Sequence, residues 1–183
     1  MMSFDVEMFK RAMSQFATGV TIVTTRDGDD VHGMTANAFS SVSLDPMLVL
    51  VCIAKPLRTH EMIQKSGIFA VNILALSQRE LAERFAGMVP GVEDRFEGIA
   101  YQTATTGAPV FDEALAWVDC RLWATYDGGD HTIFVGEVVD GAVLNDGTRE
   151  PLLYFNRRWA HLGPVEQRGS SPWPKKTSDD ETE

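Results

Sequence analysis

The segment GMTANAFSSVSLDP at residues 33–46 continues into MLVLVCIA at residues 47–54 and KPLRT at residues 55–59. This pattern indicates a strand, a polar loop, a second buried strand and the start of a helix. Small side chains and free backbone N–H groups can accept the edge of a flat heterocycle, while Lys55, Arg58 and Thr59 at a helix N-terminus suit a phosphate. The segment predicts a site for a nucleotide-like ligand, although an ordinary hairpin with a Ser/Thr-rich connection gives a similar pattern.

The composition is that of a single globular domain. The chain has 183 residues, of which 44% are hydrophobic and 23% charged, which is ordinary for a soluble protein. Its longest strongly apolar run, residues 47–54, is far shorter than the ~20 residues of a membrane helix, and residues 1–7 carry no secretory signal pattern. We therefore expect no membrane segment. Cys52 and Cys120 lie in separate apolar runs, so we expect both to be buried free thiols and the protein to reside in the reducing cytoplasm.

The net charge of −10 limits the possible partners. Nucleic acid requires a basic stripe, so we expect no nucleic-acid partner. The same negative field repels a nucleotide phosphate. A nucleotide site would therefore need a local positive pocket made from Lys55, Arg58 and the amides of a helix end.

Hydrophobic spacing predicts a helix over residues 5–17. Val6, Phe9, Met13 and Phe16 recur at three- and four-residue intervals, and Ser3 is a candidate N-cap. We expect this apolar face to lie on a sheet. Shorter helices are expected at residues 59–64, ended by a glycine, and after a Ser-x-x-Glu capping box at residues 77–80.

Runs rich in β-branched residues predict an antiparallel sheet. The expected strands are residues 18–25, 31–39, 47–54, 68–73, 115–126, 131–139 and 152–160. Turn signals separate them, among them Asp27-Gly28 and the segment DGGD at residues 127–130. Hairpin-like spacing favours an antiparallel barrel with outer helices over a doubly wound sheet, and no G-x-G-x-x-G motif follows a strand. Residues 164–183 are polar, so we expect disorder or loose draping over a partner beyond a domain at residues 1–163.

The sequence contains no recognisable acid, base or nucleophile for hydrolysis. Its four histidines lack metal-ligand spacing, no G-x-S-x-G motif occurs, and neither cysteine has an evident histidine partner. We therefore expect no metal site. A polar nucleotide cradle without such groups can still belong to an enzyme if a cofactor brings the reactivity.

Six short motifs in order resemble the short-chain flavin reductase family. They are FATGVTIVT at 16–24, GMTAN at 33–37, SSVSLDP at 40–46, FAVNIL at 69–74, GDH at 129–131 and LLYF at 152–155. The similarity extends over roughly residues 5–162. It implies a mainly β, Greek-key-like antiparallel split β-barrel that binds FMN or FAD, with flanking helices.

The resemblance also implies roles for individual residues. Residues Thr35 to Ala38, with Met34 beside them, would lie along the isoalloxazine and ribityl groups. Cys52, Ile53 and Ala54 would offer backbone amides to the ring edge. Lys55 and Thr59 would hold the phosphate, Phe85 would close one wall, and His131 would lie near the incoming NADH or NADPH. Many relatives have serine where this chain has Ala38, so Ser40 or Ser41 would have to supply that hydroxyl.

The implied function is an NAD(P)H-dependent flavin reductase that supplies reduced flavin to a separate monooxygenase. Hydride transfer needs the nicotinamide and flavin rings stacked, which positioning alone can provide. The resemblance also implies a homodimer. The alternatives are a non-catalytic split barrel that binds flavin or haem, and an oxidase of the pyridoxamine-phosphate type, which would need more cations around a second phosphate. A purely structural dimer is a third alternative, and it would leave the segment at residues 33–59 unexplained.

Overall fold

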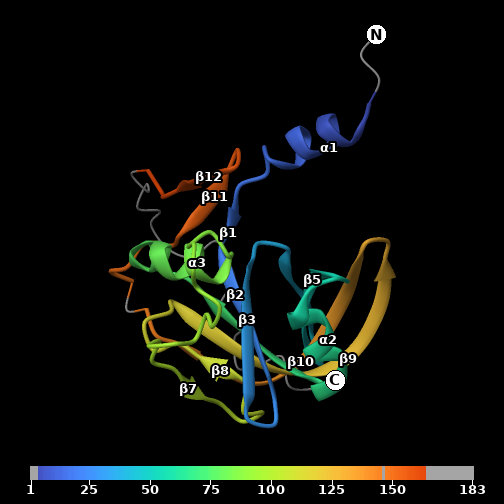
Figure 1. Ribbon diagram of the computed structural model, residues 1–183, viewed down its shortest axis with the longest axis vertical. Coiled ribbons are helices and arrows are strands. Elements are labelled where there is room, and N and C mark those ends of the chain that lie inside the picture. The colour runs from blue at the N-terminus through green and yellow to red at the C-terminus, as the bar shows by residue number, and fades with distance from the viewer. Residues whose placement is uncertain (1–3, 146, 164–183) are drawn as a thin grey trace, which may run out of the picture.

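One large antiparallel sheet forms the body of the protein (Figure 1). The structure is a computed structural model and describes residues 4–145 and 147–163. The strands run in the order β3-β2-β6-β9-β10-β5-β4. They are β2 (Thr21–Asp27), β3 (Asp30–Ala36), β4 (Phe39–Leu44), β5 (Met47–Ala54), β6 (Ile68–Ile73), β9 (Ala116–Gly128) and β10 (His131–Val143). Strands β3 and β4 lie at opposite edges of the sheet, yet only two residues join them, so the sheet must curl back on itself. Among the described residues, β3 and β4 are not paired with each other. The prediction of a mainly β, antiparallel split barrel is confirmed.

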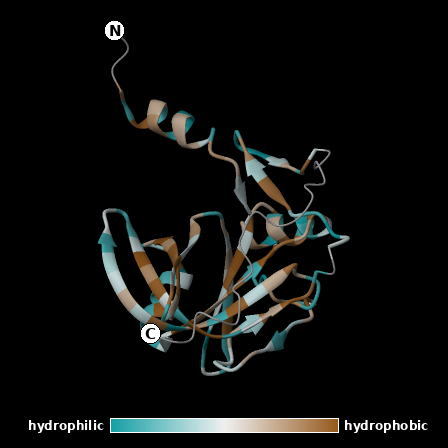
Figure 2. Ribbon diagram, turned by 180° about the vertical axis from the view of Figure 1, so that it is seen from behind, coloured by the Kyte–Doolittle hydropathy of each residue, from teal (hydrophilic) through white to brown (hydrophobic). Residues whose placement is uncertain are grey.

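Alternating burial along β5 shows why the sheet has two different faces. Val49, Val51 and Ile53 are at most 7% exposed and belong to the main core, whereas the residues between them are half-buried. Successive side chains of a strand point to opposite faces, so one face of β5 packs in the core and the other lies open. Figure 2 shows the resulting apolar colouring along the strands of the body.

The helices cover the sheet at separate places. Helix α2 (Arg58–Ser66) directly follows β5 and ends at Gly67, whose φ of 68° is left-handed, as the sequence predicts. Helix α3 (Arg79–Phe85) follows the 3₁₀ turn η1 (Leu76–Gln78). The predicted cap by Ser77 is wrong: the Gln78 Oε1 atom accepts a hydrogen bond from the Ala75 amide at 3.0 Å instead.

Three strand predictions need correction. The strand expected at residues 31–39 ends at Ala36, and strand β4 (Phe39–Leu44) occupies most of the segment expected as a loop after residue 39. Two short strands, β7 (Gln102–Thr103) and β8 (Pro109–Val110), occur in the segment expected to be irregular. The last predicted strand is a hairpin, β11 (Leu153–Phe155) and β12 (Arg158–Ala160), which pairs with β1 (Thr18–Gly19) in a separate sheet. Its turn has two consecutive residues of positive φ, Asn156 and Arg157, which periodicity alone does not reveal.

Helix α1 (Val6–Met13) projects from the body instead of lying on the sheet (Figure 1). The exposed fractions of Val6, Phe9 and Met13 are 66%, 51% and 55%. The helix is present as predicted. Its predicted burial against the sheet and its predicted N-cap are wrong. Asp5 is the N-cap, and its Oδ1 accepts a hydrogen bond from the Met8 amide at 2.9 Å.

The prediction for the tail, residues 164–183, lies outside the described residues. Among the residues that are described, no helix is both long and apolar enough to cross a bilayer.

Candidate functional site

A cleft of about 880 Å³ opens where the β3–β4 connection meets β5. Four of the predicted flavin-contacting residues line it, namely Asn37, Ala38, Ser40 and Cys52. The connection is held in place because the Cys52 amide donates to the Ala38 carbonyl at 3.0 Å. Apolar lining predominates, as expected for a site that encloses a flat ring system.

The open face of β5 aligns several predicted residues in one row. In the antiparallel register, Ala54 lies opposite His131 and Cys52 lies opposite Ile133. Directly opposed residues share a face, so Cys52, Ala54 and His131 all project from the open side of the sheet. Burial raises the pKa of the Cys52 thiol, which keeps it neutral. Ile53 faces the core with no exposed surface, so only its backbone can take part in a site.

Backbone geometry limits which amides of β5 can serve a ligand. The Cys52 amide is already bonded to the β3–β4 connection, and the Lys55 amide donates to the Asp130 carbonyl at 3.0 Å. The Ala54 amide points to the same side as that of Cys52. In the β4–β5 ladder, Phe39 is the first residue of β4 and lies opposite Val51, so Ala54 extends past the end of β4. Of the two predicted amides that point towards β4, that of Ala54 therefore has the more open position.

Lys55 follows the last residue of β5 and pairs with Asp127, which lies near the end of β9. Its Nζ donates to the Asp127 Oδ1 atom at 2.6 Å. This hydrogen bond and the lysine charge lower the pKa of the Asp127 carboxyl. Three residues of strand separate Lys55 from Cys52, a span of about 10 Å. The backbone of the lysine thus lies about 10 Å along the chain from that of the cleft residue Cys52.

His131 begins β10 and is half-buried. Its Nδ1 lies 2.7 Å from the Asp130 Oδ1 atom, and this hydrogen bond lowers the pKa of the Asp130 carboxyl. A neighbouring carboxylate favours a proton on Nδ1, which directs Nε2 away from Asp130. The ring is thereby oriented on the same face as Ala54.

Four further predicted residues lie near the cleft without lining it. Thr35 and Ala36 border a smaller pocket of about 150 Å³ on the other side of Asn37, and the Thr35 hydroxyl donates to the Ala82 carbonyl at 2.6 Å. Met34 packs against the main core. Ser41 lies opposite Val49 in the register, so its side chain points away from the face that Ser40 occupies.

The structure does not bring Thr59 and Phe85 to the cleft, because neither has any exposed surface. The Thr59 hydroxyl lies 2.9 Å from the His32 Nδ1 atom beneath α2. Phe85 packs edge-on against Phe96 and Phe111 in a second core. A direct contact between either side chain and a flavin would require this packing to open.

The opposite wall of the cleft was not predicted from the sequence. That wall comes from the end of α1 and from β1, with Met13, Phe16, Ala17, Thr18 and Gly19. The signal was present in the motif FATGVTIVT, which we used for the resemblance and not for the site. Apolar residues at helical spacing predict core packing, and nothing in their pattern predicts a cleft.

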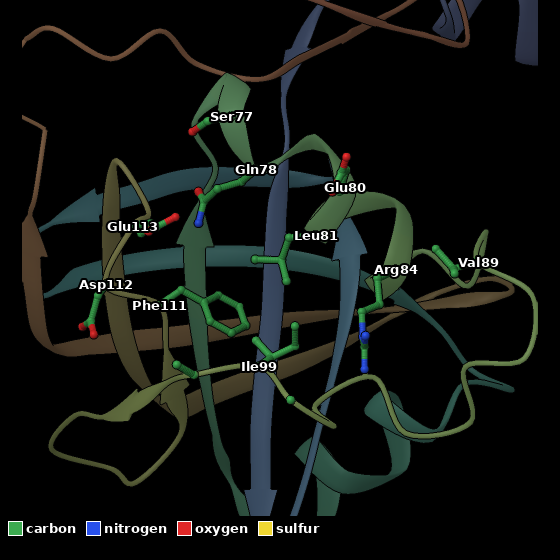
Figure 3. Close-up of a pocket in the computed structure, with 12 residues that line it drawn as sticks. Ser77, Gln78, Glu80, Leu81, Arg84, Val89, Ile99, Phe111, Asp112 and Glu113 are labelled. Carbon is green, nitrogen blue, oxygen red and sulfur yellow. The ribbon is translucent and has the colours of Figure 1, made fainter.

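A second cleft, of about 620 Å³, lies at α3 and contains none of the predicted residues (Figure 3). Leu81, Ile99 and Phe111 line it, and Glu113 stands at its rim. The Arg84 guanidinium is not free to bind an anion there, because it donates to the carbonyls of residues 94, 95 and 97. Its acidic rim, which also includes Glu80 and Asp112, disfavours a phosphate.

The fold and the cleft define a β-barrel with a nucleotide-sized site, and comparison with known proteins identifies its family. Residues 13–163 match the model of the flavin reductase like domain. The chain is 35% identical to the reductase subunit HsaB of a flavin-dependent monooxygenase from Rhodococcus jostii (strain RHA1), over 93% of this chain and 85% of that one. It is 38% identical to an NADH-dependent FAD reductase from Streptomyces globisporus, over 90% of each chain.

Solved structures agree in fold as well as in sequence. The flavin reductase PheA2 matches with a TM-score of 0.81 and 42% identity, covering 88% of this chain and all of that one. The Streptomyces globisporus NADH:FAD oxidoreductase SgcE6, in complex with NAD and FAD fragments, matches with a TM-score of 0.80 and 36% identity, covering 88% of this chain and 95% of that one. The chain belongs to the flavin reductase like family, so the family resemblance seen in the sequence is confirmed.

Proposed function

We propose that this protein is an NAD(P)H-dependent flavin reductase that supplies reduced flavin to a separate monooxygenase. The observation that carries the proposal is the alignment of Cys52, Ala54 and His131 on the open face of β5 and β10, beside the cleft. Relatives named as reductase components of monooxygenases support the enzyme class and the existence of a monooxygenase partner. FAD and NADH are the substrates favoured by the relatives' names.

The size and largely apolar lining of the cleft support a flavin site. Asn37, Ala38, Ser40 and Cys52 would bound the ring system, Lys55 would hold the phosphate, and His131 would orient the nicotinamide. The two nucleotides supply the hydride transfer when bound, so the protein needs no acid or base for that step. Its contribution is to hold the reacting rings ~3–3.5 Å apart and to place backbone N–H groups where negative charge develops.

The test is to mix the purified protein with NADH or NADPH and with FAD or FMN, and to follow loss of the reduced nicotinamide absorbance. We expect flavin-dependent oxidation of at least one nicotinamide nucleotide, and the four combinations determine the preference for each. Flavin binding without oxidation would favour the non-catalytic binding module instead. Absence of both binding and turnover would exclude the proposed function.

The proposal includes a homodimer and a cytoplasmic location. The uncovered apolar face of α1 supports the dimer: Val6, Phe9, Met13 and Phe16 are 51–74% exposed, and burying such a face against a second copy is favourable. Met13 and Phe16 also line the cleft, so dimerisation would alter the cleft itself. Sedimentation equilibrium tests this directly, and Phe9→Asp should shift a dimer towards monomer.

A further inference from the structure

Carboxylates from two hairpins neutralise the cations around α2. Lys55 pairs at 2.6 Å with Asp127, which lies near the end of β9 just before the β9–β10 turn. Arg58 pairs with Asp30 and Lys65 pairs with Asp27, both from the β2–β3 hairpin. The positive charge expected for a phosphate site is therefore cancelled locally.

The pair between Lys55 and Asp127 is open to exchange. The side chains of Lys55 and Asp127 are 44% and 78% exposed, and such a pair contributes little to stability. Asp127 nevertheless cannot leave the neighbourhood, because the Lys55 amide is hydrogen-bonded to the Asp130 carbonyl of the adjoining turn at 3.0 Å. A phosphate that approaches Lys55 must meet this carboxylate.

We propose that Asp127 sets the flavin affinity, acting as a fixed counter-charge that competes with the flavin phosphate for Lys55. The inference rests on the proposed function, in which Lys55 holds that phosphate. The lysine ammonium has three donors and can contact both anions at once. The carboxylate and the phosphate then repel each other at short range, which weakens binding of the phosphate.

Such a counter-charge suits a reductase whose product must leave. A flavin held by an unopposed lysine would remain on the protein after reduction, whereas a competing carboxylate speeds its dissociation. Affinity differences between closely related sites lie mainly in the dissociation rate. Asp127 would thus help to make flavin a substrate that exchanges instead of a resident group.

The test compares Asp127→Asn with the unaltered protein by fluorescence titration of FMN, FAD and riboflavin. The expected result is that FMN and FAD bind about three- to tenfold more tightly to Asp127→Asn at low salt, with a smaller gain at high salt. Riboflavin has no phosphate, so its affinity should not change. Stopped-flow measurements should show slower release of FMN from Asp127→Asn.

Asp27→Asn is the matched control, since it removes the same charge from a carboxylate that pairs with Lys65 at the far end of α2. Its flavin affinities should equal those of the unaltered protein. Equal or weaker FMN and FAD binding by Asp127→Asn would overturn the inference, as would equal tightening of riboflavin. If the unaltered protein oxidises NADH with flavin while Asp127→Asn shows no tightening, only this inference fails. If the unaltered protein neither binds flavin nor oxidises NADH, both fail.

Discussion

The two faces of the β5–β10 ladder have the same backbone and opposite characters. On the α2 face, Ile53 has no exposed surface, and His60 contacts the Thr132 hydroxyl through its Nε2 at 2.7 Å. On the cleft face, the neighbouring residues Ala54 and His131 are half-buried. A shift of one residue along either strand therefore moves a side chain from a packed core to a candidate site.

This difference separates the residues that stabilise the fold from the residues that can bind a ligand. The α2 face holds polar groups that are already paired, so a ligand would gain little there. The cleft face holds small side chains and a histidine oriented by Asp130, which leaves room and hydrogen-bonding capacity for a ligand. The comparison predicts that mutations on the α2 face change folding, while mutations on the cleft face change binding.

The largest expected effect is on folding, from Ile53→Ala. Truncating this fully buried residue should lower the free energy of unfolding by about 2–5 kcal/mol, because it removes buried methyl groups and leaves a cavity. Urea unfolding followed by circular dichroism measures the change. Leu50→Ala, on the cleft face of the same strand, is the matched comparison and should cost less. An equal loss for both variants would contradict the distinction between the faces.

Lys55→Ala should have the next largest effect, and on binding alone. Loss of the lysine should weaken FMN binding by roughly 1.5–3 kcal/mol, the range for a hydrogen bond to a charged group. Fluorescence titration measures this, and unfolding in urea should barely change because the side chain is exposed. Unaltered FMN affinity would remove Lys55 from the site.

How far the sequence predicted these faces depends on the kind of signal. The continuous apolar run at residues 47–54 correctly predicted β5, and turn residues such as Asp27-Gly28 correctly placed the β2–β3 hairpin. Strand β4 was missed because its serines suit a loop as well as an exposed edge. The apolar spacing of α1 correctly predicted a helix but not where its face lies, since a face that meets a second molecule has the same pattern as one that meets the core.

The candidate site was predictable only in part, for a physical reason. Asn37, Ala38, Ser40 and Cys52 are close in the chain, and the structure brings them into one cleft. Residues far apart in sequence, such as Asp127 and Lys55, meet only through strand register, which no local pattern encodes. Burial also depends on the whole fold, so nothing near Thr59 revealed that His32 would cover it.

A pH effect should come from the α2 face. Burial first, and then the nearby charge of Arg95, lower the pKa of His32 to about 4 from 6.5. Between these values the unfolded chain binds more protons than the folded one, so stability falls as pH is lowered through this window. Because His32 is only partly buried, solvent screening keeps the contribution lost between pH 7 and 5 well below the ~2 kcal/mol that the full shift would give. Urea unfolding of His32→Gln at both pH values should show a smaller loss than the unaltered protein, and an equal loss would contradict the assignment.

The smallest expected effect comes from His131→Ala on the cleft face. If His131 orients the nicotinamide through one neutral hydrogen bond, its loss should raise the KM for NADH by a factor that corresponds to about 1 kcal/mol. Flavin affinity should stay the same, because Ala54 and Cys52 keep their positions in β5 through the Lys55–Asp130 and Cys52–Ala38 hydrogen bonds. Steady-state kinetics with varied NADH, together with a flavin titration, separate the two. A loss of flavin affinity with unchanged KM would place His131 on the flavin side of the cleft and would reverse the order of the two ligands along β5.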